Sequence, residues 1–346
     1  MVDPELTGLN DPIAVTPPRR RRSARRTSHI DVGFDHDGGL VVHGAARDLL
    51  TGDDGAPTEV DAAEVTAVIG RDRRLVSLET SRPLSVERLL GLSVGPGFRA
   101  ALDEAAADER ARSTPLYLLM DDLPVITLIS GYALLYSGEV RDLDGDARMV
   151  REDICAGWRS DGTMMVSLRT RGVIPVPFGP EPNDLLPAED PLAWHDLPSL
   201  GAGAMRRQRL VEVTAGEPMA VFAMFRDTHA DAGGATSVLH EYSVEGELDA
   251  RSMVLTRCTA RPQVLPWAEC PAAAPSAAWL EGHKIDQVRQ LVRERFRGTE
   301  TCTHLNDLLR SLGDLGVLAR WVTGASRSPG DGTCVSGAGA TCANTS

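Results

Sequence analysis

Hydrophobic and polar positions divide the chain into two stretches with globular patterning. In the first, short apolar alternations at 30–32, 40–42 and 59–80 predict β-strands, and residues 86–107 predict helices broken by turns. A second series starts at 205–213. It contains an alternating run from His240 and a helical apolar stripe that ends at Leu312. The predicted fold class is therefore α+β.

The segments outside these two series predict a connection and two tails. Residues 123–135 and 163–170 predict additional strands, and the Pro-rich residues 173–200 predict an irregular connection. The stretch rich in Arg and Pro at the start and the stretch rich in Gly, Ser and Ala at the end predict disordered, solvated tails. The predicted organisation is a basic tail (1–26), a first unit (27–123), a bridging β or irregular segment (124–202), a second unit (203–322) and a tail (323–346).

The second unit repeats features of the first. Arg47-Asp48 and Arg82-Pro83 recur as Arg226-Asp227 and Arg261-Pro262, displaced by the same number of residues. Two further matches align residues 29–32 with 210–213, and residues 114–119 with 303–308. Such agreement predicts two related units, each a small, mostly antiparallel sheet packed on helices, which form a pseudo-dimer within one chain.

Composition narrows the class of protein. The chain has 346 residues, 42% of them hydrophobic, which is enough for two domains, and a net charge of −13, which argues against nucleic-acid binding. No apolar leader follows the N-terminal arginines, and Asp121 and Asp122 interrupt the most apolar stretch, so no membrane span is expected. Six cysteines are too few for a disulfide scaffold in a chain of this length. We expect a cytoplasmic protein with reduced thiols.

Cys302 and His304 are the strongest candidates for chemistry. They flank Thr303 where a loop is predicted to become a helix, and unpaired amides at a helix N-terminus stabilise a thiolate. The first unit has Ser113 and Pro115 at the corresponding positions. The repeat therefore predicts that the first unit is structural and that the second carries the site.

Two further residues complete a predicted set of metal ligands. Cys270 precedes Pro271 and a run of small residues that predicts a helix, and His240 begins the alternating strand. Two thiols and two imidazoles suit Zn²⁺, iron or an iron–sulfur cluster. The predicted ligands are His240, Cys270, Cys302 and His304.

Other donors are interpreted as structural. Cys258 lies in a predicted core strand, and His229 and His283 are expected at the surface. Cys334 and Cys342 lie in the C-terminal tail and are not counted as ligands.

The motif Cys302-Thr303-His304-Leu305, together with His240-Glu241, Cys270-Pro271 and Leu280-Glu281-Gly282, resembles the bacterial family named domain of unknown function 2889. The likeness covers about 205–322, and Thr301 and Tyr242 replace the glycine and methionine of the family pattern. The order of these motifs also resembles, more distantly, the iron–sulfur scaffold proteins of the NifU/IscU type. That resemblance implies a small antiparallel sheet on helices with a zinc or iron–sulfur site at one end.

These features predict a metal-binding protein whose site is structural or carrier-like, and three alternatives stay open. A site with an open metal position would make the chain a metal-dependent hydrolase, with Glu241 or Asp307 as general base. Cys302 could instead act as a metal-free nucleophile with His240 as its base. A third alternative is an accessory protein without metal, in which Trp158, Trp194 and Trp267 mark an apolar surface and the arginine-rich tail contacts an unknown protein partner.

Overall fold

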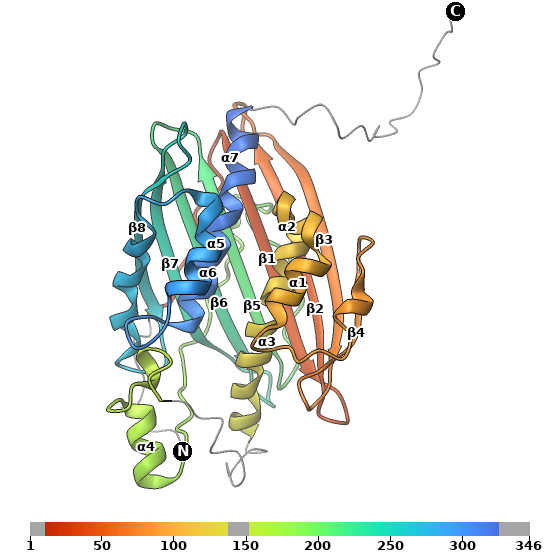
Figure 1. Ribbon diagram of the computed structural model, residues 1–346, viewed down its shortest axis with the longest axis vertical. Helices are drawn as coiled ribbons and strands as arrows, with labels where there is room; N and C mark the ends of the chain where they lie inside the picture. The colour runs from red at the N-terminus through yellow and green to blue at the C-terminus, as the bar shows by residue number, and fades with distance from the viewer. Residues whose placement is uncertain (1–10, 138–151, 325–346) are drawn as a thin grey trace, which may run out of the picture.

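The computed structural model describes residues 11–137 and 152–324, which are arranged in layers around one large sheet (Figure 1). Within these residues eight antiparallel strands pair in the order β4-β3-β2-β1-β5-β6-β7-β8. The strands are β1 (Ser23–Phe34), β2 (Leu40–Thr51), β3 (Pro57–Ile69), β4 (Leu75–Thr80), β5 (Met205–Thr214), β6 (Met219–Ala230), β7 (Thr236–Leu248) and β8 (Leu255–Val264).

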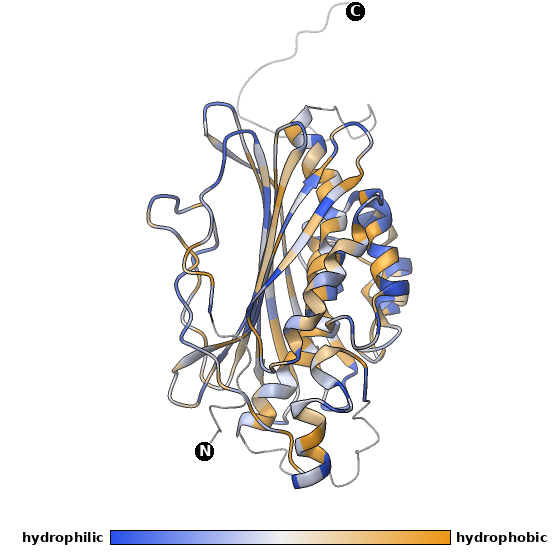
Figure 2. Ribbon diagram, turned by 90° about the vertical axis from the view of Figure 1, so that its left-hand side faces the viewer, coloured by the Kyte–Doolittle hydropathy of each residue, from blue (hydrophilic) through white to orange (hydrophobic). Residues whose placement is uncertain are grey.

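Most helices cover one face of the sheet, while irregular segments cover the other (Figure 2). The helices are η2 (Val86–Arg88), α1 (Phe98–Ala105), α2 (Ala107–Arg112), α3 (Pro115–Ser137), η4 (Ala156–Trp158), α4 (Thr163–Arg171), η5 (Cys270–Leu280), η6 (Ile285–Gln287), α5 (Val288–Arg295), α6 (Thr303–Ser311), η7 (Leu312–Asp314) and α7 (Leu315–Thr323). On the opposite face, Ile13, Asn183 and Trp194 contact arginines of the sheet through their backbone carbonyls. Mixed helix and strand structure with an antiparallel sheet confirms the predicted α+β class.

Each half of the sheet is followed in sequence by its own helices. Strands β1–β4 precede α1–α3, and β5–β8 precede η5 and α5–α7. The halves meet where β1 pairs with β5, and this seam carries two ion pairs. Arg25 lies opposite Glu212, Asp31 lies opposite Arg206, and each pair has an N–O distance of 2.6 Å. The central seam is therefore held by side chains as well as by backbone hydrogen bonds.

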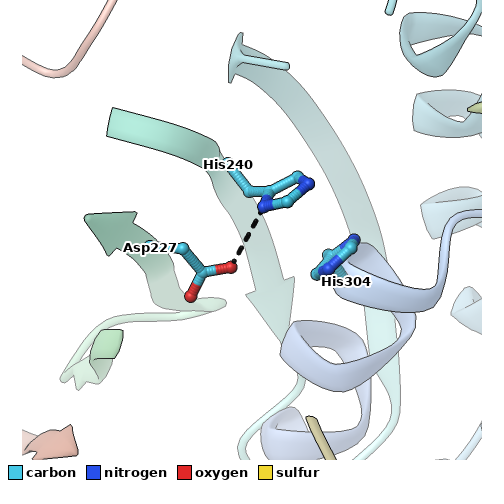
Figure 3. Close-up of side chains that lie close together, drawn as sticks. All are labelled: Asp227, His240 and His304. Atoms are coloured by element: carbon cyan, nitrogen blue, oxygen red, sulfur yellow. Dashed lines mark ion pairs between the residues drawn. The ribbon is translucent and has the colours of Figure 1, made fainter. Parts of the chain in front are cut away.

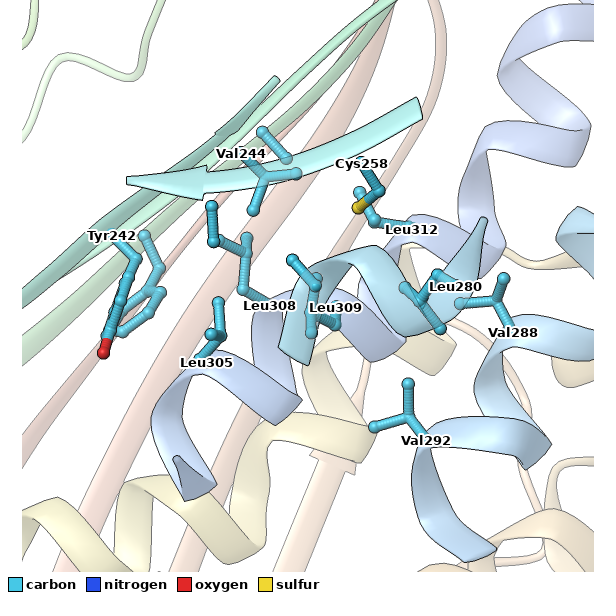
Figure 4. Close-up of a cluster of buried hydrophobic side chains, with 14 of the residues drawn as sticks. Tyr242, Val244, Cys258, Leu280, Val288, Val292, Leu305, Leu308, Leu309 and Leu312 are labelled. Atoms are coloured by element: carbon cyan, nitrogen blue, oxygen red, sulfur yellow. The ribbon is translucent and has the colours of Figure 1, made fainter. Parts of the chain in front are cut away.

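Two apolar cores lie between the sheet and the helices. In the second half, leucines of α6 and η7 recur at helical spacing and face residues of β7 and β8 (Figure 4). Leu305 and Leu308 lie near Tyr242 and Val244 of β7, and Leu312 lies near Cys258 of β8. This packing fixes the start of α6 over β7.

Buried charges join the helices of the two halves. Asp121 of α3 binds Arg310, Arg289 and Arg99, with N–O distances of 2.7, 3.2 and 3.1 Å. Its neighbour Asp122 binds Arg209 of β5 at 2.7 Å. A buried charge is stable only when it is paired, so these contacts fix how α3 sits against the second half.

The predicted basic tail (1–26) is wrong for residues 11–26. Strand β1 begins at Ser23, and Arg25 and Arg26 are almost fully buried. Arg26 forms two hydrogen bonds with Asp48, and Arg19 binds Asp190 at 2.7 Å. Taken alone, a run of arginines predicts a solvated segment. Its carboxylate partners are distant in sequence, so the local sequence does not indicate them. Residues 1–10 and most of the predicted C-terminal tail (325–346) lie outside the described residues.

The strands predicted at 123–135 and 163–170 are both helical. Residues 123–135 belong to α3, which is buried on nearly all sides and so shows no apolar stripe. Residues 163–170 belong to α4, whose first amide is bound by the carboxylate of Glu269 at 2.8 Å. Residues 124–137 of the predicted bridging segment (124–202) therefore belong to α3, in the helical layer.

Helix α3 is long and apolar enough to cross a bilayer, and it is the one such helix among the described residues. However, 67% of its most apolar window is buried inside the molecule, as is typical of a core helix.

Candidate metal centre

A bulge in β7 directs His240 toward the helices. Asp227 of β6 lies opposite His240, but Thr228 lies opposite Val238, so Leu239 is the extra residue. A bulge re-aims the side chains that follow it. Strand β8 pairs with β7 only from Glu241 onward, so His240 lies where β8 has already left the sheet. His240 therefore follows a bulge inside β7. The prediction that His240 begins this strand is wrong, because β7 starts at Thr236.

Asp227 lies beside His240 at the base of the site (Figure 3). Its carboxylate accepts two hydrogen bonds from Arg207, at 2.7 and 2.8 Å, and one of its oxygens is 3.4 Å from Nδ1 of His240. Burial alone would raise the pKa of Asp227, but Arg207 and His240 outweigh it and hold that pKa below its ordinary value. An ionised carboxylate at Nδ1 orients the imidazole, which is its usual role behind a histidine ligand.

His304 stacks on His240. The ring centroids are 3.8 Å apart and the rings are 18° from parallel (Figure 3). Burial and the neighbouring His240 lower the pKa of His304 well below its ordinary value, so its ring is neutral near pH 7. Nε2 of His304 is buried without a hydrogen-bond partner. Asp227, His240 and His304 are the one group of three in the described part of the chain whose donor atoms all lie within 4.8 Å.

The start of α6 places Cys302 beside the stacked histidines. Cys302 is the N-cap residue of α6, and its thiol sulfur is 4.0 Å from Nδ1 of His304. The expected helix-start corner is confirmed. The expected fall in thiol pKa is wrong, because burial and then Cys155 raise the pKa of Cys302 to about 12. The amides of Leu305 and His304 only partly oppose this rise.

Cys270 lies in the same apolar core as Cys302. It begins η5, and its carbonyl accepts a hydrogen bond of 3.2 Å from the hydroxyl of Tyr242. Burial raises the pKa of the Cys270 thiol well above its ordinary value, and the nearby Cys302 adds to the rise. The structure thus brings His240, His304 and Cys302 together and places Cys270 next to Cys302. These four residues as a metal-ligand set remain a prediction.

The two candidate general bases have different surroundings. Glu241 points to the opposite face of the sheet, where it is fully buried, pairs with Arg226 and accepts a hydrogen bond from the amide of Ile13. It cannot serve a site at His240, because successive strand residues face opposite ways. Asp307 lies on the helix face. Burial alone would raise its pKa, but Arg310 and Arg99 outweigh it and keep that pKa below its ordinary value.

The predictions for the three donors that were not counted as ligands agree with the structure only in part. Cys258 is buried in β8 and packs in the core, as predicted. His229 was expected at the surface but is 2% exposed, because Tyr132 and Tyr136 of α3 pack against its ring. His283 is half-buried.

The sequence did not predict that Asp227 and Cys155 lie beside the candidate ligands. Asp227 carried one signal, since it belongs to the Arg-Asp pair that recurs as Arg47-Asp48. The sequence contains no such signal for Cys155, because this residue is distant in sequence from Cys302 and lies in an irregular stretch. Its position beside Cys302 depends on a tertiary contact, the hydrogen bond of 2.8 Å from the amide of Ala156 to the carbonyl of Thr301.

Comparison with known proteins finds a family match in the second half of the chain. Residues 205–317 match the family described as "Protein of unknown function (DUF2889)", which supports the predicted relationship of this part of the chain to that family. The match contains His240, Cys270, Cys302 and His304 but not Cys155. Neither the curated proteins nor the solved structures include a match to this chain.

Proposed function

We propose that the second half of the chain binds one transition-metal centre, and that the protein is a metal-binding protein with a structural or carrier role. The ligands in this proposal are His240, Cys302, His304 and Cys270, with Asp227 holding the His240 ring in place. Zinc and iron, including iron in an iron–sulfur cluster, are the metals that such nitrogen and sulfur donors suit.

One observation carries the proposal: two stacked imidazoles, one of them with a buried and unpartnered Nε2 at His304, lie beside an ionised carboxylate and a thiol. A buried polar atom without a partner costs about 1–3 kcal/mol. A cation bound by Nε2 of His304 would remove that cost. The hydrolase alternative is weaker, because Glu241 faces away from the site and the oxygens of Asp307 are engaged by arginines.

We also infer that the two halves descend from one repeated unit. Asp48 lies opposite Arg26 and Asp61, just as Asp227 lies opposite Arg207 and His240. A register shift follows each aspartate, between Asp48 and Leu49 and between Asp227 and Thr228. In the first half, Asp61 takes the place of His240 and pairs with Arg82. That guanidinium supplies the positive charge there, which supports a purely structural first half.

The test is elemental analysis of the protein purified anaerobically as wild type, Cys302→Ala and His304→Ala. We expect near-stoichiometric zinc or iron in the wild type and less than about a tenth of that in each variant. His283→Ala is the matched control and should keep the metal, since its side chain is outside the set. A wild-type protein free of zinc and iron, which also fails to take up either when reconstituted, would refute the proposal.

A further inference from the structure

We propose that Cys155 supplies a third thiolate to this centre, together with Cys270 and Cys302, so that the bound species is a thiolate-preferring metal. This inference rests on the proposed function and deepens it, because it fixes the chemical class of metal. It also adds a ligand from outside the stretch that matches the family.

Backbone contacts bring Cys155 to the start of α6. The amide of Ala156 donates to the carbonyl of Thr301 at 2.8 Å, which joins the residue after Cys155 to the residue before Cys302. Cys155 is 7% exposed and Cys302 is 5% exposed, so both thiols are in the interior. Two cysteines that are distant in sequence are thus held at one buried corner.

A glycine lets the same segment approach Cys270. A Cβ atom at Gly157 would lie 2.7 Å from Sγ of Cys270 and 2.9 Å from the Trp267 ring. No side chain fits in that space, so the backbone of η4 packs directly against the thiol. Cys155 and Cys270 therefore approach Cys302 from two different segments.

Tyr242 packs in the same core as Cys270 and Cys302. Its hydroxyl donates to the carbonyl of Cys270. The three buried thiols and the stacked imidazoles of His304 and His240 make a donor set of three sulfurs and two nitrogens. Such a set suits Zn²⁺ or an iron centre, whereas Mg²⁺ and Ca²⁺ require oxygen donors.

The spacing of the thiols adds one requirement. Among the described residues, Asp227, His240 and His304 have donor atoms that all lie within 4.8 Å of one another, and the three thiols are not grouped closely enough to hold an ion as they stand. The metal must therefore draw the thiols together, or be a centre of more than one atom that spans them. In either case binding releases thiol protons.

Cobalt titration tests this inference, since sulfur-to-cobalt charge transfer reports bound thiolates. The full chain is used with Cys334 and Cys342 replaced by Ser, so that the tail contributes no thiols. In this background Cys155→Ser should lose about one third of the charge-transfer intensity, as expected for two thiolates instead of three. Cys258→Ser is the matched control, because Cys258 is equally buried but lies in the core of β8. Mg²⁺ should not compete with cobalt.

The possible failures are distinguishable. If the background protein binds no cobalt and takes up neither zinc nor iron on reconstitution, the proposed function fails and this inference fails with it. If Cys302→Ser loses intensity while Cys155→Ser keeps all of it, the metal site stands and the role of Cys155 is refuted. Alkylation of the background protein checks this result without a Cys155 variant. Zn²⁺ should protect Cys155 together with Cys302 and leave the labelling of Cys258 unchanged, whereas equal labelling of Cys155 with and without Zn²⁺ would refute the inference.

Discussion

Asp227 and Asp48 are two buried carboxylates with the same kind of arginine partner and different surroundings. Asp227 binds Arg207 and also faces His240, whereas Asp48 binds Arg26 and has no histidine beside it in the described structure. Since loss of a carboxylate behind a histidine ligand weakens metal binding, we expect Asp227→Asn to lower zinc affinity by about 10–100-fold. Zinc competition with a chromophoric chelator measures this change.

Asp48→Asn is the matched control for that substitution. Both variants leave a buried arginine with a weaker partner, so both should lower the free energy of unfolding. Only Asp227→Asn should change zinc affinity. Equal losses of affinity in the two variants would show that Asp227 acts through stability and not through His240.

His195 is a half-buried base that resists protonation. Its Nε2 lies 3.0 Å from the hydroxyl of Thr27, and its ring packs edge-on against His29. Burial, and then the neighbouring His29, lowers the pKa of His195 to about 4. In the unfolded chain the ring has its ordinary pKa of about 6.5.

That difference makes stability depend on pH. Between pH 7 and pH 5 the unfolded chain takes up a proton at His195 that the folded protein does not, so stability falls as the pH falls. We expect His195 to account for about 2 kcal/mol of the loss at pH 5. Urea unfolding of wild type and His195→Gln at both pH values measures it. The drop should be smaller in the variant, and identical drops would show that the ring is protonated in the folded state.

At the scale of elements, patterns that depend on one solvated face were predictable and buried elements were not. The sequence predicts a second globular series from Met205, a helix start at Cys302 and a helix after Cys270, and the structure has β5, α6 and η5 at these places. Helix α3 was mistaken for a strand because it is apolar all round. Its acidic residues looked like breaks in an apolar run, whereas they bind arginines of the second half.

The candidate site divides in the same way. Cys302 and His304 could be predicted because they share one turn of chain. The arrangement of Asp227 and His240 depends on a bulge at Leu239, and nothing in the local sequence specifies the strand that lies opposite. Cys155 depends on a contact between segments that are far apart in the chain. Register and long-range contacts are therefore what the sequence alone could not supply.

Helix α3 should depend strongly on Asp121. We expect Asp121→Asn to lower the free energy of unfolding by about 3–5 kcal/mol, because Arg310 and Arg289 would keep buried charges without this carboxylate. Asp161→Asn, at an exposed pair with Arg159, should leave stability nearly unchanged. Urea unfolding of both variants checks this. A small effect of Asp121→Asn would mean that water solvates the arginines in place of the carboxylate.

At the scale of the whole molecule, the two halves share charges as well as a sheet. Besides the seam between β1 and β5, Asp121 and Asp122 of the first half bind Arg310 and Arg209 of the second. In the other direction, Arg26 of β1 binds Asp314 at 3.0 Å. The second half therefore contains the candidate metal centre but relies on the first for the partners of its buried charges.

This dependence predicts the behaviour of the second half in isolation. A fragment of residues 203–324 would expose the edge of β5 and leave Arg209, Arg310 and Asp314 without their partners from the first half. An open edge strand promotes association, and unpaired buried charges oppose folding. We expect the fragment to aggregate or to unfold without a cooperative transition, while the full chain unfolds in one step. Size-exclusion chromatography and thermal circular dichroism distinguish these outcomes. A monomeric fragment with a cooperative transition near the Tm of the full chain would instead show that the second half is an independent domain.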